Sequence, residues 1–310
     1  MSSSISLGKP SFDDSLGALL VGGLVAMALW GVTCMQTYTH FTRKSTDRPA
    51  FRVMIAFLSA LDTFDSALNA HILYYYMVTH FLDPLALLVP IWSFSAHVGV
   101  TTISVFIIRT MFALRAYRLS NRNLVLMTWI MTISITDLVV GTYITIRAFR
   151  MDTFMGLKDL SNFMYFNFAA ATLTDLSIAV SLCYLLHKSR TGFMRTDSLI
   201  SVLIMYAVNT GVIVAVDASL GLVAYVTMPK NLIFFAFYLL LSKLYLNSYL
   251  AGLNARETLR DRFQMGDPIS VHSQFTPMNL GSNSSFPSIK SGGSRKGIAV
   301  HTVITSDSVV

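Results

Sequence analysis

The sequence has little charge and almost no glutamate. Charged residues make up 13% of its 310 positions, and Glu257 is the single glutamate. A typical soluble protein has roughly 25% charged residues. Hydrophobic residues reach 54%, and the mean hydropathy is +0.58. So few charges cannot cover the surface of a soluble fold, and so many apolar residues exclude disorder over most of the chain. The composition predicts an integral membrane protein.

Cysteine and catalytic motifs are also scarce. The two cysteines, Cys34 and Cys183, lie in apolar runs, where thiols act as small packing groups. Two isolated cysteines exclude a disulfide-stapled fold and a CxxC metal pattern. The chain contains no HExxH or GxSxG motif, no glycine-rich phosphate loop and no credible catalytic triad. We therefore expect a protein that is not an enzyme, with no catalytic, cofactor-binding or metal-binding residues.

Long apolar runs dominate what is present. A bilayer core needs roughly 20 apolar residues per helix. Seven stretches of this length occur, at about 16–39, 51–78, 89–116, 123–146, 161–186, 198–226 and 231–250. They predict an all-α, seven-transmembrane helix bundle over residues 16–256, after a short extracytoplasmic segment at 1–15. Because the loops are short, we expect sequential helices to pack as neighbours.

The loop charges predict the orientation, since cytoplasmic loops are enriched in Lys and Arg. Thirteen basic residues lie on one side and five on the other. The first set is Arg43, Lys44, Arg48, Arg52, Arg115, Arg118, Arg122, Lys188, Arg190, Arg195, Arg256, Arg260 and Arg262; the second is Lys9, Arg147, Arg150, Lys158 and Lys230. We expect the N-terminus outside, the C-terminus in the cytoplasm, and the plasma membrane as the location. The net charge of +7 favours anionic lipid headgroups on the cytoplasmic side over nucleic acid.

The end of the chain has a different composition. Residues 267–310 hold ten Ser, three Thr, four Gly and three Pro. Such a segment cannot bury enough apolar surface to offset its ordering entropy. We expect residues 257–310 to form a mostly disordered cytoplasmic tail, whose serines beside basic residues permit phosphorylation.

Two acids lie in the middle of the second predicted span. Asp62, Asp65 and Asn69 are spaced i, i+3 and i+7 and so share one face of a helix. An ionisable group in a span costs about 2.5–3.5 kcal/mol on insertion scales, so this face must point into the bundle or a wet cavity. Two interpretations stay open: a proton or cation site, or a hydrogen-bonded polar seam between helices.

Further acids lie in the later spans, with few possible countercharges. Asp137, Asp175 and Asp217 are within or near the fourth, fifth and sixth spans. Arg109 and Lys243 are the main cations available to them. Each cation either extends to the cytoplasmic interface or forms an ion pair inside the membrane.

Short motifs follow one another from residue 170 to 256. They are Asp175-Leu-Ser-Ile-Ala, Lys188-Ser-Arg-Thr-Gly-Phe, Arg195-Thr-Asp-Ser-Leu-Ile, Tyr206-Ala-Val-Asn-Thr-Gly, Met228-Pro-Lys-Asn, Leu241-Ser-Lys-Leu-Tyr-Leu-Asn-Ser and Leu253-Asn-Ala-Arg. In this order they resemble a large fungal family of seven-helix membrane proteins known as domain of unknown function 6534. The resemblance implies family membership and a seven-helix topology, and it implies no activity.

The polar residues of these motifs suggest a network. We expect Asn209, Asp217, Lys243 and Asn247 to join Asp175 between the fifth, sixth and seventh helices. Lys243 and Asn247 are spaced i, i+4 and so face the same direction.

Three functions are compatible with this topology. The first is a receptor-like sensor or membrane scaffold, with a cytoplasmic signalling partner. The second is a proton-coupled transporter that uses Asp62 and Asp65. The third, which we rank low, is a retinal-binding protein with Lys243 as the Schiff base; the third span offers no carboxylate counterion.

Overall fold

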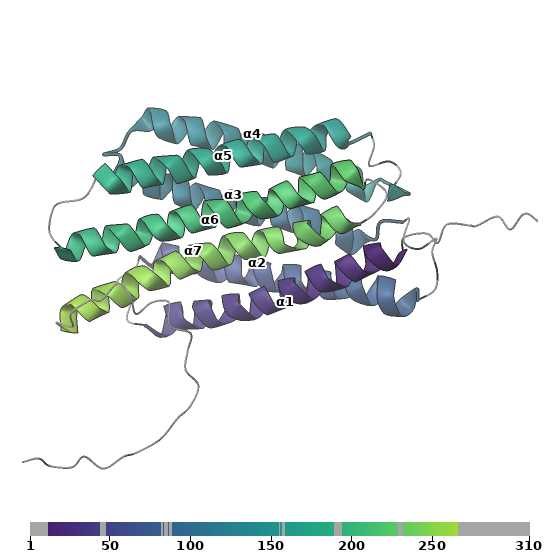
Figure 1. Ribbon diagram of the computed structural model, residues 1–310, viewed down its shortest axis with the longest axis horizontal. Coiled ribbons are helices and arrows are strands. Elements are labelled where there is room, and N and C mark those ends of the chain that lie inside the picture. Colours follow the sequence, from purple (N-terminus) through teal and green to yellow (C-terminus); the bar gives the residue numbers. More distant parts are fainter. Residues whose placement is uncertain are drawn as a thin grey trace, which may run out of the picture. The chain divides into compact units, whose positions relative to one another are not determined.

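The structure is a computed structural model that describes residues 12–43, 48–81, 83, 86, 89–154, 156, 159–188, 194–228 and 232–265. The described residues form long helices and no strand (Figure 1). These helices are α1 (Phe12–Thr42), α2 (Pro49–Tyr74), α3 (Trp92–Leu119), α4 (Leu124–Phe149), α5 (Ser161–Lys188), α6 (Met194–Thr227) and α7 (Ile233–Met265). A short π-helical turn, η1 (Tyr75–Thr79), extends α2. Each predicted span corresponds to one helix.

The helices have the length and surface of membrane spans. Six of them, all except α2, are long and apolar enough to cross a bilayer. Large apolar side chains point outward along the bundle, including Val53, Val125, Val139, Leu176 and Val223. The interior contains apolar side chains together with buried charged ones such as Asp62, Arg109 and Lys243, while the outer surface of the bundle carries many large apolar groups, unlike the surface of a soluble protein. The chain is a multi-pass membrane protein.

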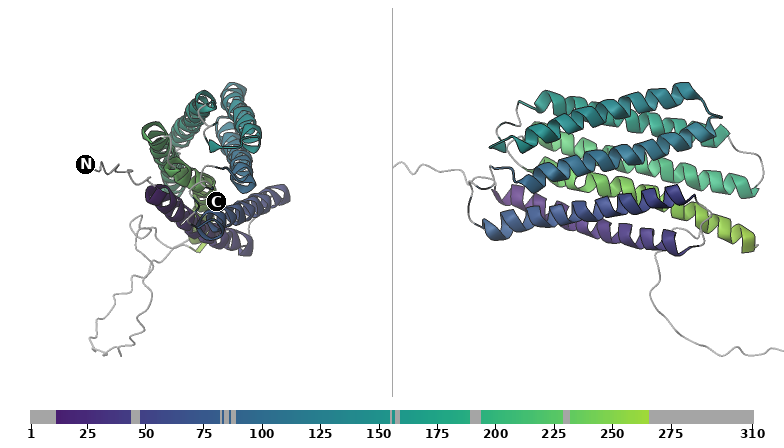
Figure 2. Two further views of the ribbon diagram at one scale, coloured as in Figure 1. Left: turned by 90° about the vertical axis from the view of Figure 1, so that its right-hand side faces the viewer. Right: turned by 180° about the vertical axis from the view of Figure 1, so that it is seen from behind.

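The helices form a ring with two members that reach into its centre. Each helix packs against the next one along the chain, as predicted, and α7 also packs against α1 and closes the ring (Figure 1; Figure 2, left). In addition α3 contacts α5 and α7. In their most apolar windows, 56% of the residues of α3 and 61% of those of α7 are buried, against 17–29% for the other four helices that qualify as spans. Among these six helices, α3 and α7 therefore have the largest buried share and form most of the interior of the bundle.

The end of α7 lies beyond the predicted boundary. The span was expected to end near residue 250, but the helix continues to Met265, so residues 257–265 are helical rather than part of the tail. Good helix formers such as Ala255 and Glu257 allow this extension. Arg43, just after α1, also anchors it by donating to the Thr258 hydroxyl at 2.7 Å. The rest of the predicted tail, residues 266–310, and residues 1–11 of the N-terminal segment lie outside the described residues.

A glycine allows α1 to approach α7 closely. A Cβ atom placed on Gly22 would lie 2.8 Å from both the Cβ and the carbonyl oxygen of Ala236. Backbones that approach this closely need small residues at the contact, as is common between membrane helices. Gly17, one and a half turns earlier, has open space around its Cα.

We predict that Gly22→Ala destabilises the bundle, because the added methyl group meets backbone atoms that cannot rotate away. Overpacking of this kind costs about 1–3 kcal/mol. The matched control Gly17→Ala should leave the melting temperature of the detergent-purified protein unchanged or slightly higher. Equal melting temperatures for the two variants would contradict the close α1–α7 contact.

Candidate functional site

Among the residues that the structure describes, two clusters of charged side chains surround the buried cations Arg109 and Lys243. The arginine cluster consists of Arg109, Asp137, Asp175 and Tyr245, and the lysine cluster consists of Asp62, Asp65, Ser66, His97, Ser242 and Lys243. The two cations are among the most deeply buried side chains, with 2% of Arg109 and 0% of Lys243 exposed. Arg109 belongs to α3 and Lys243 to α7, the two helices that carry the interior.

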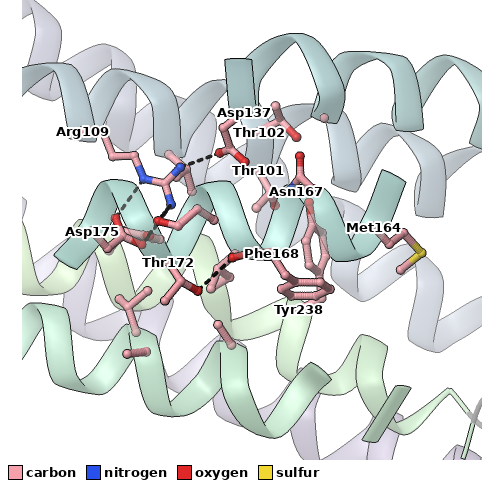
Figure 3. A pocket seen from close by; sticks show the side chains of 18 of the residues that line it. Thr101, Thr102, Arg109, Asp137, Met164, Asn167, Phe168, Thr172, Asp175 and Tyr238 are labelled. Atoms are coloured by element: carbon pink, nitrogen blue, oxygen red, sulfur yellow. Dashed lines mark hydrogen bonds and ion pairs between the residues drawn. The ribbon is translucent and has the colours of Figure 1, made fainter. Parts of the chain in front are cut away.

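Arg109 binds two carboxylates from two neighbouring helices. Its Nε and one terminal nitrogen donate to the two carboxylate oxygens of Asp175 on α5, both at 2.9 Å. Its other terminal nitrogen donates to Oδ2 of Asp137 on α4 at 2.5 Å. The planar guanidinium group suits this forked arrangement, because its N–H donors point in fixed directions. One side chain therefore links α3, α4 and α5 (Figure 3).

Tyr245 on α7 completes the arginine cluster. Its hydroxyl accepts from Arg109 at 2.8 Å and donates to Oδ2 of Asp175. Both oxygens of Asp175 are thereby bonded. Asp137 differs, because its Oδ1 has no hydrogen-bond partner among the described residues. With both carboxylates ionised, the cluster holds two negative charges against one positive charge.

The lysine cluster joins α7 to α2 and α3. The Nζ of Lys243 lies 2.8 Å from Oδ1 of Asp62 and 3.0 Å from Oδ2 of Asp65, and it donates to the Ser66 hydroxyl at 2.7 Å. His97 on α3 places its Nδ1 2.6 Å from Oδ1 of Asp65. Two carboxylates thus surround one lysine, with an imidazole on the outer side of the second carboxylate. The face of α2 predicted from the i, i+3 spacing does point into the bundle.

The geometry of α7 separates the two clusters. Lys243 and Tyr245 are two residues apart, which corresponds to about 200° around a helix. Their side chains therefore leave α7 on opposite sides, Lys243 toward α2 and Tyr245 toward α3 and α5. This arrangement divides the interior into one side next to α2 and another enclosed by α3, α4, α5 and α6.

A cavity of about 540 Å³ occupies the second side. Its walls are mostly apolar and come from α3 to α7, and the arginine cluster lies at its edge (Figure 3). From there the lining runs past Tyr238 to Met151 and Leu160, which belong to the connection between α4 and α5. The volume lies within the range of small-molecule sites, about 300–1,000 Å³. Lys243 does not line this cavity.

The structure places the predicted site residues at several separate positions in the bundle. Asp62, Asp65 and Lys243 come together in the lysine cluster, and Asn69 is fully buried one to two turns away on the same helix. The Asn247 amide donates to the carbonyl oxygen of Leu29 on α1 at 2.9 Å.

The expected network between α5, α6 and α7 takes another form in the structure. Lys243 pairs with acids of α2 rather than with Asp175, which binds Arg109 instead. Asn209 is exposed on α6. Asp217 is 7% exposed, and its Oδ2 has no partner among the described residues. The physical reason is competition: Arg109 offers Asp175 a forked pair on the side of α5 that faces α3.

Sequence reasoning did not assign Arg109, Asp137 and Tyr245 to the site, although the first two were recognised as span residues. One signal was available for Arg109. It lies ten residues before the end of α3, which is about 15 Å along the helix axis. A cation this far from the end of the helix favours an ion pair inside the bundle, which is one of the two interpretations left open by the sequence. Nothing in the spacing of Tyr245 marked it as part of a charge cluster.

Comparison with known families gives one match. Residues 171–258 match the model of a family of unknown function, DUF6534. The resemblance inferred from the motifs is thus confirmed for this segment, which covers most of α5, all of α6 and most of α7. It contains Asp175, Lys243 and Tyr245, while Arg109 and the acids of α2 and α4 precede it. Neither the curated proteins nor the solved structures give a match.

We predict that Arg109→Met destabilises the protein severely, because Asp137 and Asp175 then remain in the interior without a countercharge. Removing one partner of a buried ion pair costs about 3–5 kcal/mol. The control Arg118→Met alters an exposed arginine at the end of the same helix and should change stability by less than about 0.5 kcal/mol.

The triple variant Arg109→Met, Asp137→Asn, Asp175→Asn carries no charge in the cluster and should recover part of the loss. Chemical or thermal unfolding in detergent measures the stability of all three variants. An Arg109→Met protein as stable as the Arg118→Met control would show that the pairing does not hold the bundle together.

Proposed function

We propose that this protein is a receptor-like membrane sensor that binds a small ligand in the cavity lined by α3 to α7. The observation that carries the proposal is the cavity itself, which has a largely apolar lining and a charged group at one edge. Sites for small molecules commonly have this composition: apolar walls and a few polar groups that fix orientation. A bundle that served only as a scaffold would have no need for so large a space between its helices.

The connection between the cavity and the helices supports sensing. The lining includes Arg109, Asp137, Asp175 and Tyr245, and these four side chains join α3, α4, α5 and α7. A ligand that changes the hydrogen bonds of this cluster would alter the packing of four helices at once. Population of a second packing by differential binding is the physical basis of a receptor response.

The topology that we propose with this function has α2 as the seventh span, the N-terminus outside and the C-terminus in the cytoplasm. Two arguments support α2: it runs alongside α1 and α3, and its acids are compensated by Lys243 and His97 (Figure 1). The orientation rests on the excess of basic residues at the α1–α2, α3–α4 and α5–α6 connections. In this orientation the cavity lies toward the outer side, because its lining reaches the α4–α5 connection.

The same orientation places the basic connections where they would contact anionic headgroups and a cytoplasmic signalling partner. We propose the plasma membrane as the location and no catalytic activity for the chain. The retinal-binding alternative gains no support from the cavity, because Lys243 does not line it and is held instead by Asp62 and Asp65.

A cavity-filling variant tests the proposal. We expect 4-phenylbutanol to bind saturably to the protein in lipid nanodiscs above the background of empty nanodiscs, as measured by ligand-detected NMR. Ala215→Trp places an indole ring in the cavity and should abolish saturable binding. The control Val216→Trp changes the next residue, which is exposed on the outside of α6, and should bind as the wild type does.

Binding should also change hydrogen exchange in the α3–α4 connection, residues 120–123, in the wild type and in Val216→Trp. Saturable binding of equal strength to Ala215→Trp would place the ligand elsewhere. Binding with no change of exchange in that connection would contradict a sensing role.

One observation favours the second candidate, a proton-coupled transporter. The lysine cluster gathers two carboxylates, an amine and an imidazole within the bundle, and such intramembrane groups are common in proton relays. The cavity does not include Asp62, Asp65 or Lys243, however, and these side chains are at most 3% exposed. Substrate and proton sites that do not share a cavity make the transporter the weaker proposal.

Proton flux distinguishes the two functions. We expect proteoliposomes that contain the wild-type protein to take up no more protons, under an imposed pH gradient, than protein-free vesicles. The variant Asp62→Asn is the control, since it removes one acid of the lysine cluster. Uptake by the wild type that disappears in Asp62→Asn would establish a carrier and contradict the sensor.

A further inference from the structure

The polar lining of the cavity contains hydrogen-bond acceptors that lack donors. Oδ1 of Asp137 and Oδ1 of Asn167 are both buried and have no partner among the described residues. The Thr101 hydroxyl also has no hydrogen-bond partner among the described residues, and Thr101 is 1% exposed. Buried polar atoms without partners are rare in folded proteins, and each needs an explanation. All three side chains line the cavity, and Figure 3 labels them in the part of it that also holds Arg109 and Tyr238.

Thr101 differs from its neighbours on α3 in a way that points to the cavity. Thr102 and Thr110 donate their hydroxyls to the carbonyl oxygens four residues earlier, both at 2.8 Å, as threonines in membrane helices usually do. Thr101 makes no such bond among the described residues, although it lies on the same helix. Its hydroxyl is therefore available to a molecule in the cavity.

The balance of charge in the arginine cluster indicates which charge a ligand in the cavity would carry. Arg109 supplies one positive charge, whereas Asp137 and Asp175 supply two negative charges when ionised. Asp175 uses both oxygens within the cluster, so the unbalanced negative charge resides on Asp137. Its free oxygen belongs to a side chain that lines the cavity. A cation would compensate this charge, while an anion would be repelled by it.

We propose that the cavity binds an organic amine in its protonated form, with an apolar body. The proposal rests on the ligand-binding function proposed above and names the chemical class of the ligand. An ammonium group has three N–H donors and no acceptor. It matches three oxygens without donors, one of them charged. The apolar body then occupies the remaining space, which is lined by rings such as Phe94, Phe235 and Tyr238.

The aromatic rings that line the cavity are also suited to lie beside a protonated amine. Phe94 and Phe235 stack with ring centroids 4.1 Å apart, and Phe235 and Tyr238 with centroids 6.1 Å apart. Together they form a continuous apolar wall of the cavity. The faces of aromatic rings attract cations, so an amine is tolerated beside them more readily than a carboxylate.

Three probes with one body and different head groups test the proposal. They are 4-phenylbutylamine, 4-phenylbutanol and 4-phenylbutyrate, and each is titrated against the full-length protein in nanodiscs at neutral pH, with empty nanodiscs as the background. We expect the amine to bind about tenfold or more tightly than the alcohol, as a charge-assisted hydrogen bond allows. The carboxylate should bind more weakly than the alcohol.

The variant Asp137→Asn removes the charge and keeps the shape of the side chain. We expect it to lower the affinity for the amine by about tenfold while it changes the affinity for the alcohol by less than about twofold. The control Asp217→Asn changes another buried acid, which does not line the cavity and belongs to neither charge cluster, and it should leave all three affinities unchanged. If Asp137→Asn does not fold, the comparison of the three probes on the wild-type protein still tests the proposal.

The outcomes separate the two proposals. If the alcohol binds saturably but the amine binds no better, or if the carboxylate binds best, the cavity takes ligands of another class and only this inference fails. If Asp137→Asn folds and keeps the wild-type preference for the amine, Asp137 does not recognise the ligand and the inference fails as well. If none of the three probes binds the wild type saturably, the proposed ligand-binding function fails and this inference fails with it.

Discussion

A cation in the centre of a membrane bundle needs a carboxylate from another helix, and this requirement organises the whole interior. Water is absent from the lipid core, so an unpaired charge there is far more costly than at a protein surface. Arg109 on α3 and Lys243 on α7 are the two cations buried most deeply among the described residues. Their partners come from α4 and α5 in the first case and from α2 in the second. The pairings thereby determine which helices surround α3 and α7, and which face each helix turns inward.

The cavity is a consequence of the same arrangement. At the level of Arg109 the ion pairs hold α3, α4 and α5 at the distance set by one guanidinium group. Small residues such as Ala171, Ala215 and Ala218 are part of the cavity lining and fill less of the interior than larger side chains would. The charged cluster therefore forms one edge of the space, and apolar side chains form the rest. Arg109, Asp137, Asp175 and Tyr245 line the cavity and also join α3, α4, α5 and α7, which is the structural condition for the proposed sensor.

Much of the fold followed from the sequence, because the physical signal for a membrane helix is strong and local. Apolar runs of about 20 residues indicated each helix, and their boundaries differ from the structure by a few residues except at the end of α7. That helix continues through Arg256 and Glu257, where hydropathy no longer marks it but helix propensity and the contact with Arg43 maintain it. Hydropathy therefore locates the part of a helix that lies in the membrane and not the full length of the helix.

The pairing of charges could be predicted only in part. The sequence showed that Asp62 and Asp65 must face inward and that few countercharges exist, and both points agree with the structure. It could not show which acid each cation binds, because five acids and two cations allow many pairings. The choice depends on the rotation of each helix about its axis: Lys243 and Tyr245 lie two residues apart and contact different clusters. Rotation is set by the packing of all the helices together, as at the Gly22–Ala236 contact.

The most direct test of this account is the distance between Arg109 and its two acids in a lipid bilayer. Solid-state NMR on protein with ¹⁵N-labelled arginine and ¹³C-labelled aspartate measures the dipolar coupling between guanidinium nitrogens and carboxylate carbons. The account predicts strong couplings from Arg109 to both Asp137 and Asp175, as expected for N–O separations of 2.5 Å and 2.9 Å. Couplings from Arg109 to neither acid would contradict the arrangement on which the bundle, the cavity and the proposed ligand all depend.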